Sequence, residues 1–66
     1  MTAYSVDIRR ILYIESRDKL IFFHLVDGTV LRTYWKLDEV EKELPKQSFI
    51  RCHQSFIVNL THIMVY

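Results

Sequence analysis

The chain has 66 residues and a formal net charge of +1; 50% of its residues are hydrophobic, and glycine and proline occur once each. A chain of this length forms one small domain at most, which excludes a large enzyme with a deep cleft between two lobes. The hydrophobic fraction excludes a disordered tail, and the low glycine and proline content excludes a collagen-like or low-complexity chain. We therefore expect one domain over residues 1–66 with its own hydrophobic core.

The charges are unevenly distributed along the chain. Residues 37–44 hold four acidic side chains against one lysine, a net charge of −3 that leaves +4 for the other residues. This separation is compatible with a modest nucleic-acid-binding surface. The one cysteine, Cys52, cannot form an internal disulfide, and the sequence shows neither a signal peptide nor an apolar run long enough to span a membrane. We therefore expect a cytoplasmic protein without a membrane partner.

The first half of the chain predicts strands. Residues 11–14 are β-branched and aromatic, as in a buried strand, and the charged residues 15–19 predict a loop. Two further β-rich runs, residues 20–26 and 29–34, flank Asp27-Gly28. This dipeptide predicts a two-residue type I′ hairpin turn, in which both central residues have positive φ.

That turn fixes a register for the hairpin. It places Leu25 opposite Val30, Phe23 opposite Arg32 and Ile21 opposite Tyr34. One face of the hairpin is then mainly apolar, and we expect it to face the core. Its members are Ile21, Phe23, Leu25, Val30 and Tyr34, with Arg32 as the single charged residue.

The second half predicts one short helix followed by more strands. Leu37, Val40 and Leu44 form an apolar stripe at helical spacing over residues 37–44. Lys36 is a poor N-cap, and Pro45 ends the helix. Residues 49–52 and 56–60 predict strands, the polar residues 53–55 interrupt them, and residues 63–66 form a last apolar run. The expected fold is mainly β with one short helix.

Residues capable of catalysis or metal binding are scattered. Cys52 and His53 are adjacent, so on a strand their side chains point to opposite faces and cannot pair as nucleophile and base. No zinc-ligand spacing and no glycine-rich phosphate loop are present. We interpret Cys52 as a small core residue and expect no enzyme, metal, cofactor or small-molecule substrate.

Two polar segments remain as candidate binding residues. His53, Gln54 and Ser55 separate two apolar runs, so their backbone is expected to turn outward. The segment is either a polar turn that satisfies its own backbone or a DNA-contacting turn, because glutamine forms paired hydrogen bonds to adenine and serine and lysine bind phosphates. Arg17, Asp18 and Lys19 occupy the other polar segment.

Three stretches carry a resemblance to a known family. Residues 49–59 read F-x-R-x-H-x-S-x-x-V-N, with an isoleucine four residues later; residues 11–16 read I-x-Y-I-E-S, and residues 37–44 read L-x-x-V-x-x-x-L. In this order they closely resemble the LytTR family, the DNA-binding domains of bacterial response regulators. The resemblance covers nearly the whole chain from about residue 7.

The resemblance implies sequence-specific binding of double-stranded DNA by a mainly β domain, as the output module of a transcriptional regulator in a two-component system. The family inserts loops, not a recognition helix, into the major groove. Gln54 matches a base-contacting position, and Ser55 beside it is expected to bind phosphate. Residues 17–19 correspond to another DNA-facing loop, in which Arg17, Asp18 and Lys19 all remain candidates for base reading. Motif residues expected to support the loop that carries Gln54 are Arg51, His53 and Asn59.

The chain also departs from the family pattern. Family members normally have a strand before position 7 and a further hairpin after position 66, so the sequence resembles a domain truncated at both ends and incomplete at its C-terminus. Unpaired strand edges invite pairing with another chain. The alternative is therefore an interaction or self-association module that keeps the LytTR core without DNA affinity. A homodimer and an upstream receiver domain are both left open.

Overall fold

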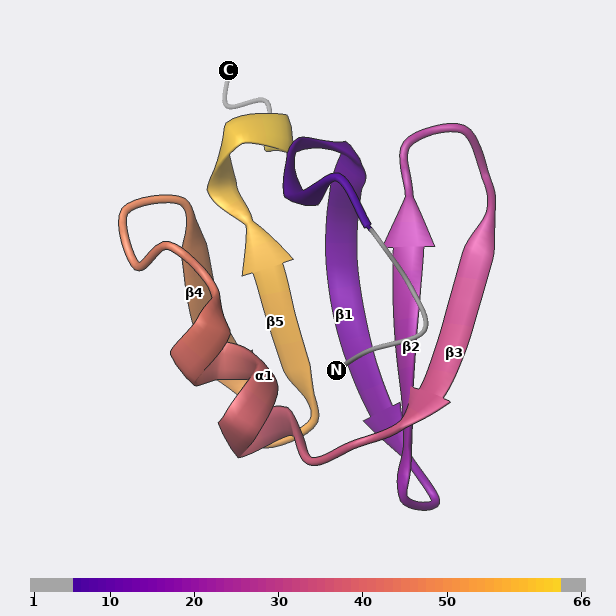
Figure 1. The fold of residues 1–66 in the computed structure, drawn as a ribbon. Helices are drawn as coiled ribbons and strands as arrows, with labels where there is room; N and C mark the ends of the chain where they lie inside the picture. The colour runs from indigo at the N-terminus through magenta and orange to yellow at the C-terminus, as the bar shows by residue number, and fades with distance from the viewer. Residues whose placement is uncertain (1–5, 64–66) are drawn as a thin grey trace.

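The computed structural model describes residues 6–63, which form a single antiparallel sheet with one α-helix on one face (Figure 1). The strand order is β3-β2-β1-β5-β4. The elements are the 3-10 turn η1 (Ile8–Arg10), β1 (Ile11–Arg17), β2 (Leu20–Leu25), β3 (Val30–Tyr34), α1 (Leu37–Glu43), β4 (Phe49–His53), β5 (Phe56–Asn59) and the 3-10 turn η2 (Leu60–His62). The predicted fold class is confirmed.

The core lies between the sheet and α1, which crosses in front of β4 and β5 (Figure 1). Ile14 on β1 and Ile57 on β5 are opposite each other in the ladder and have no exposed surface. Leu37 and Val40 of α1 are buried with them, so the predicted apolar stripe does face the sheet. Lys36 is the N-cap and makes no side-chain capping hydrogen bond, as its residue type predicts.

The Asp27-Gly28 hairpin exists, but the predicted turn type is wrong. The amide of Gly28 donates to the carbonyl of Leu25 (3.0 Å), and the amide of Leu25 donates to the carbonyl of Thr29 (2.9 Å), which closes a loop of residues 26–28. Only Gly28, at φ 90°, has positive φ in this loop. A three-residue loop with its positive φ at the last position matches the right-handed twist of the strands without requiring positive φ at Asp27.

The extra loop residue shifts the hairpin register by one. Phe23 pairs with Leu31, not with Arg32, and Ile21 pairs with Thr33. Because side chains alternate along a strand, this shift exchanges the two faces of β3. Leu31 packs against the core, whereas Val30 and Tyr34 are 49% and 81% exposed. The prediction that Val30, Arg32 and Tyr34 lie on the core face is therefore wrong, although Ile21, Phe23 and Leu25 are buried as expected.

The predicted loop over residues 15–19 is also shorter than expected. β1 continues to Arg17, which pairs with Leu20, and only Asp18 and Lys19 form the turn. Their φ values of 52° and 68° are those of a type I′ turn. Glu15 and Arg17 of β1 lie on the sheet face away from α1, where the guanidinium of Arg17 is 4.7 Å from the centre of the Phe22 ring.

Cys52 is exposed, so its interpretation as a core residue is wrong. Phe49 on the same strand faces the core, and alternation then directs Arg51 toward α1 and Cys52 toward the open face. The ladder between β4 and β5 also shifts register between Arg51 and His53, which leaves Cys52 as the extra residue of a bulge.

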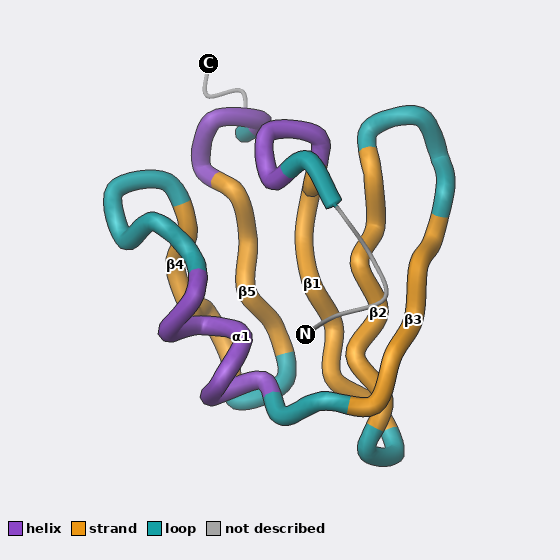
Figure 2. The backbone as a smooth tube through the Cα atoms, viewed as in Figure 1, coloured by secondary structure: helices purple, strands orange, loops and turns teal. Residues whose placement is uncertain are grey.

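The connections divide between two ends of the sheet (Figure 2). At the lower end in this view are the β1–β2 turn, the β3–α1 linker and the β4–β5 turn. At the upper end are η1, η2 and the loop of residues 26–28. Both polar segments singled out in the sequence therefore lie at the lower end.

Candidate nucleic-acid interface

The two turns at the lower end are held side by side by the sheet. β1 and β5 are neighbours, with Glu15 opposite Phe56, and the amide of Ser16 donates to the carbonyl of Ser55 (2.8 Å). The Asp18-Lys19 turn and the Gln54-Ser55 turn thus leave adjacent strands at the same end. Segments 36 residues apart in the chain, counted from Asp18 to Gln54, become neighbours through this pairing.

An open groove of about 610 Å³ runs between these turns and the start of α1, and we call it the loop-end groove. Lys19 lines it from the β1–β2 turn and Gln54 from the β4–β5 turn. The remaining lining residues are Ser16, Tyr34, Trp35, Lys36, Leu37, Asp38, Glu39 and Arg51. A base-reading candidate and a phosphate-binding candidate therefore share one surface.

Arg51 connects the β4–β5 turn to α1. Its Nε donates to the carbonyl of His53 (3.0 Å) and its Nη2 to the carbonyl of Gln54 (2.6 Å). Its Nη1 donates to the carboxylates of Asp38 (2.8 Å) and Glu41 (2.9 Å) on α1. A planar guanidinium with several donors suits this bridging position, where a lysine ammonium would not reach all four acceptors in one plane.

The carboxylates stabilise the charged guanidinium of Arg51. The hydrogen bond to Asp38 raises the pKa of Arg51 above its ordinary value, and the bond to Glu41 acts in the same direction. Asp38 and Glu41 are three residues apart, which places both on the side of α1 that faces Arg51. The acidic helix is therefore an anchor for the turn that carries Gln54.

His53 and Ser55 give the turn further internal hydrogen bonds. The amide of Ser55 donates to Nδ1 of His53 (3.1 Å), so this nitrogen carries no proton in the bonded state. The His53 ring also packs against Phe56, with 5.9 Å between centroids. Ser55 is half-buried, and its backbone is engaged on both sides. The backbone around Gln54 is held at several points, while Gln54 itself is exposed.

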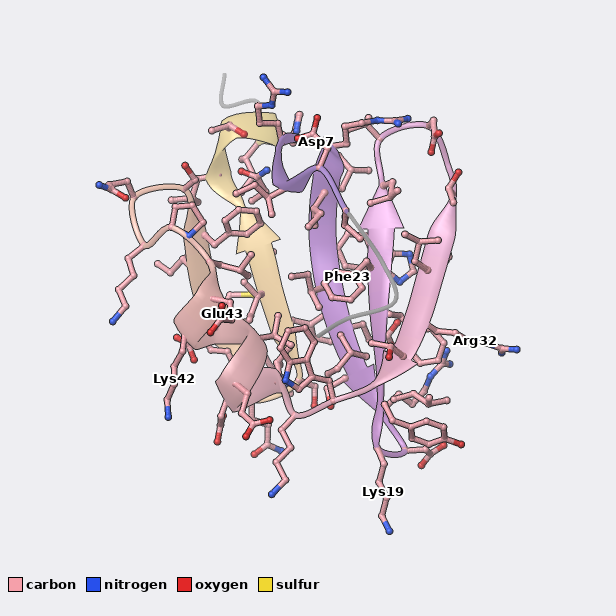
Figure 3. All side chains as sticks on the ribbon, in the orientation of Figure 1. Asp7, Lys19, Phe23, Arg32, Lys42 and Glu43 are labelled. Carbon is pink, nitrogen blue, oxygen red and sulfur yellow. The ribbon has the colours of Figure 1, made fainter. Side chains whose placement is uncertain are left out.

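The three residues of the first polar segment, Arg17, Asp18 and Lys19, do not lie together. Lys19 points away from the lower tip of the sheet into solvent (Figure 3). Arg17 stacks on Phe22 on the face away from α1 and does not line the loop-end groove. Asp18 is exposed at the turn. The structure therefore brings Lys19, and neither Arg17 nor Asp18, to the groove that Gln54 lines.

Asn59 makes its contacts at the opposite end of the sheet. It is 2% exposed, its Nδ2 donates to the carbonyl of Ile11 (2.8 Å), and its Oδ1 accepts from the amide and hydroxyl of Thr61 (3.1 and 2.7 Å). These bonds fix η2 to the start of β1. The expectation that Asn59 supports the loop carrying Gln54 is wrong, because β5 separates the two.

Sequence reasoning missed two groups of residues at this site. Asp38 and Glu41 were interpreted only as part of the acidic charge of the helix. Their spacing of three residues nevertheless indicates that they share one side of it. Tyr34 and Lys36 line the groove but were interpreted as a core residue and a poor cap. Neither has a local sequence signal, because their position depends on how β3 and α1 pack.

Two further observations concern other kinds of site. Among residues 6–63, no group of three or more histidine, cysteine, aspartate or glutamate side chains is arranged to hold a metal ion. In the same range, no helix has the length and apolar character needed to cross a membrane.

Comparison with known proteins gives consistent matches. A family model described as the LytTr DNA-binding domain matches residues 2–66. The chain is 35% and 34% identical, over 71 aligned positions, to proteins named sensory transduction protein LytT from Bacillus anthracis and Bacillus cereus; the match covers 96% of this chain and 29% of each relative. A solved structure described as the LytTr DNA-binding domain of a methyl-accepting/DNA response regulator from Bacillus cereus superimposes with a TM-score of 0.83 at 40% identity, over 91% of this chain and 54% of that one. The chain thus spans less than a third of the length of these two curated relatives.

Proposed function

Because the chain belongs to the LytTr DNA-binding domain family, whose members bind DNA in transcription regulation, we propose that it reads a specific duplex sequence with the turn that carries Gln54. In this proposal it is the output module of a response regulator. The main support is the loop-end groove, which is lined both by Lys19 and by the exposed Gln54, whose turn is held by Arg51.

Base reading is assigned to Gln54. A glutamine amide can donate to N7 and accept from N6 on the major-groove edge of adenine, a pairing that contributes about 1–3 kcal/mol of discrimination. Such discrimination requires the amide to be presented in one orientation. The hydrogen bonds from Arg51 to the carbonyls of His53 and Gln54 limit the motion of this backbone before DNA arrives.

Phosphate binding is assigned to Lys19 and Ser55, with Arg17 as an outer contact. Contacts of this kind set orientation and affinity without reading sequence. Lys19 is exposed at the tip of the turn, and Ser55 is next to Gln54. Arg17 is on the other face, so it could reach only a phosphate beyond the groove. A two-residue turn is narrow enough to enter a major groove about 12 Å wide.

The test separates the two roles. The target duplex is first obtained by selecting a randomised duplex library on the protein, and a scrambled duplex of equal composition is the reference. We expect Gln54→Ala to weaken binding to the selected duplex only, and Lys19→Ala to weaken binding to both. If Gln54→Ala changed the two affinities by the same factor, the assignment of base reading to Gln54 would be wrong.

Self-association is a second candidate function, favoured by the exposed sheet edges. β3 and β4 are the edge strands, and they carry exposed Val30 and Ile50, each 49% accessible. Unpaired edges of this kind can add a strand from a second copy. A concentration-dependent dimer in sedimentation, together with no salt-sensitive gel shift, would favour this function over DNA binding. The homodimer, the receiver domain and the cytoplasmic location stay predictions.

A further inference from the structure

The β3–α1 linker is a third segment at the loop-end groove, and no DNA contact was predicted for it. Lys36 and Tyr34 line the groove together with Lys19 and Gln54. Tyr34 is 81% exposed and pairs with Leu20, the residue that follows Lys19. The linker is therefore held next to the β1–β2 turn by the β2–β3 ladder.

Lys36 is at a position where its side chain does not help the fold. It is the N-cap of α1, where serine, threonine or aspartate would accept a hydrogen bond from the first turn, and it makes no such bond. Its backbone carbonyl accepts from the amides of Glu39 and Val40 (both 3.0 Å), a role that any residue could fill. Within residues 6–63 its ammonium belongs to no ion pair.

We propose that Lys36 and the Tyr34 hydroxyl form a further phosphate-binding segment for the same DNA duplex, beside Lys19. This inference rests on the proposed function. A side chain that reads bases in a major groove is bordered by rows of phosphates, and cations on segments around that side chain can reach them. Lys19 and Lys36 come from separate segments that both border the groove lined by Gln54. Two anchors from separate segments fix the orientation of the protein on DNA, which one flexible lysine cannot do.

The acidic residues of the groove limit this attraction. Asp38 shares the guanidinium of Arg51 with Glu41, at 2.8 and 2.9 Å, so its charge is only partly balanced. Glu39 also lines the groove and opposes the approach of a phosphate. We therefore expect Glu39→Gln to strengthen binding to every duplex, which is the opposite of the effect of removing the charge of Lys36.

The decisive variant is Lys36→Ser, because it removes the charge and supplies a good cap. The expected result is a higher urea midpoint together with weaker binding to both the selected and the scrambled duplex. A plot of log affinity against log salt concentration should lose about 0.9 from its slope, the value for one phosphate contact. Weaker binding by a more stable protein cannot result from unfolding. Tyr34→Phe should weaken binding to both duplexes and leave the slope unchanged, because it removes a neutral group.

Lys46→Gln is the matched control, because Lys46 is in the α1–β4 connection, at the other end of the helix from Lys36. It should leave the salt slope at the wild-type value. If Lys36→Ser binds both duplexes with wild-type affinity and slope while Gln54→Ala loses specificity, this inference is wrong and the proposed function stands. If the wild-type protein shows no salt-sensitive duplex binding, both are wrong.

Discussion

Nη2 of Arg51 donates a 2.6 Å hydrogen bond to the backbone carbonyl of Gln54, the residue to which we assign base reading. The same guanidinium contacts two carboxylates on α1. The helix of this domain therefore supports the β4–β5 turn. This turn lies at the end of the sheet, yet its backbone is held in one conformation like that of a packed element.

Replacing Arg51 with lysine should show whether the β4–β5 turn needs the hydrogen bonds of Arg51 or only its positive charge. Arg51→Lys keeps the charge but cannot reach all four acceptors, so we expect a loss of about 1.5–3 kcal/mol in the free energy of unfolding, the range for a hydrogen bond to a charged group. Discrimination between selected and scrambled duplex should also fall. Urea unfolding and DNA titration measure the two effects. Arg9→Lys is the control, because Arg9 is 87% exposed in η1 at the opposite end; equal effects of the two variants would contradict the account.

The left-handed conformation of Lys19 predicts an unusual response to glycine. At φ 68° a residue with a Cβ is strained by about 1–2 kcal/mol, and glycine avoids this strain. Lys19→Gly should therefore be more stable than Lys19→Ala by roughly 1 kcal/mol in urea unfolding, after the entropy cost of glycine. Both variants lack the ammonium, so both should bind DNA more weakly than wild type. Equal stability of the two would show that the turn relaxes around alanine.

Asn59 should matter for stability and not for DNA recognition. Asn59→Ala leaves the buried carbonyl of Ile11 and the amide of Thr61 without their present partner. The carbonyl of Ile11 is buried, and an unsatisfied buried group costs about 1–3 kcal/mol, so a marked fall in the free energy of unfolding is expected. Under conditions where the variant is folded, its ratio of affinities for selected and scrambled duplex should match that of wild type. A changed ratio would contradict this prediction, because it would show that Asn59 affects DNA recognition from the opposite end of the sheet.

The loop of residues 26–28 predicts a pH effect on stability. The pKa of Asp27 lies below its ordinary value of 3.8, mainly because its carboxylate accepts from the amide of Thr29 and also from Arg10. Since the folded pKa is lowered, the stabilisation is complete above pH 3.8 and is lost as the pH falls through the folded value. Asp27→Asn should thus be less stable than wild type at pH 7, and this difference should vanish in acid. Asp18→Asn, in the other tight turn, controls for the loss of one charge.

The sequence predicted the element types well and the details of the hairpins poorly. Alternation and helical spacing are local signals, and they located the strands and α1. The register of β2 and β3 depended on one extra loop residue, which Asp-Gly does not reveal, so Tyr34 was placed in the core when it is exposed. Asp18-Lys19 was missed as a type I′ turn because lysine has no preference for positive φ.

A sequence motif predicted which residues form the candidate site. It did not predict the contacts that hold these residues in place. The motif located Gln54, Arg51 and His53 in one segment, and all three are at the β4–β5 turn. The bond from Arg51 to Asp38 joins residues 13 apart and depends on how α1 crosses the sheet, which no local pattern specifies. Asn59 belongs to the same motif but is the last residue of β5, so its contacts are at the other end of that strand.

The most direct test of the central claim compares the sequences that wild type and Gln54→Ala select from one randomised duplex library. We expect both proteins to recover a shared motif, and the variant to lose base preference at one position, where wild type requires adenine. Lys19→Ala, selected in parallel, should recover the wild-type motif with lower yield. If Gln54→Ala selects the wild-type motif with every position equally constrained, Gln54 does not read DNA and the central claim is contradicted.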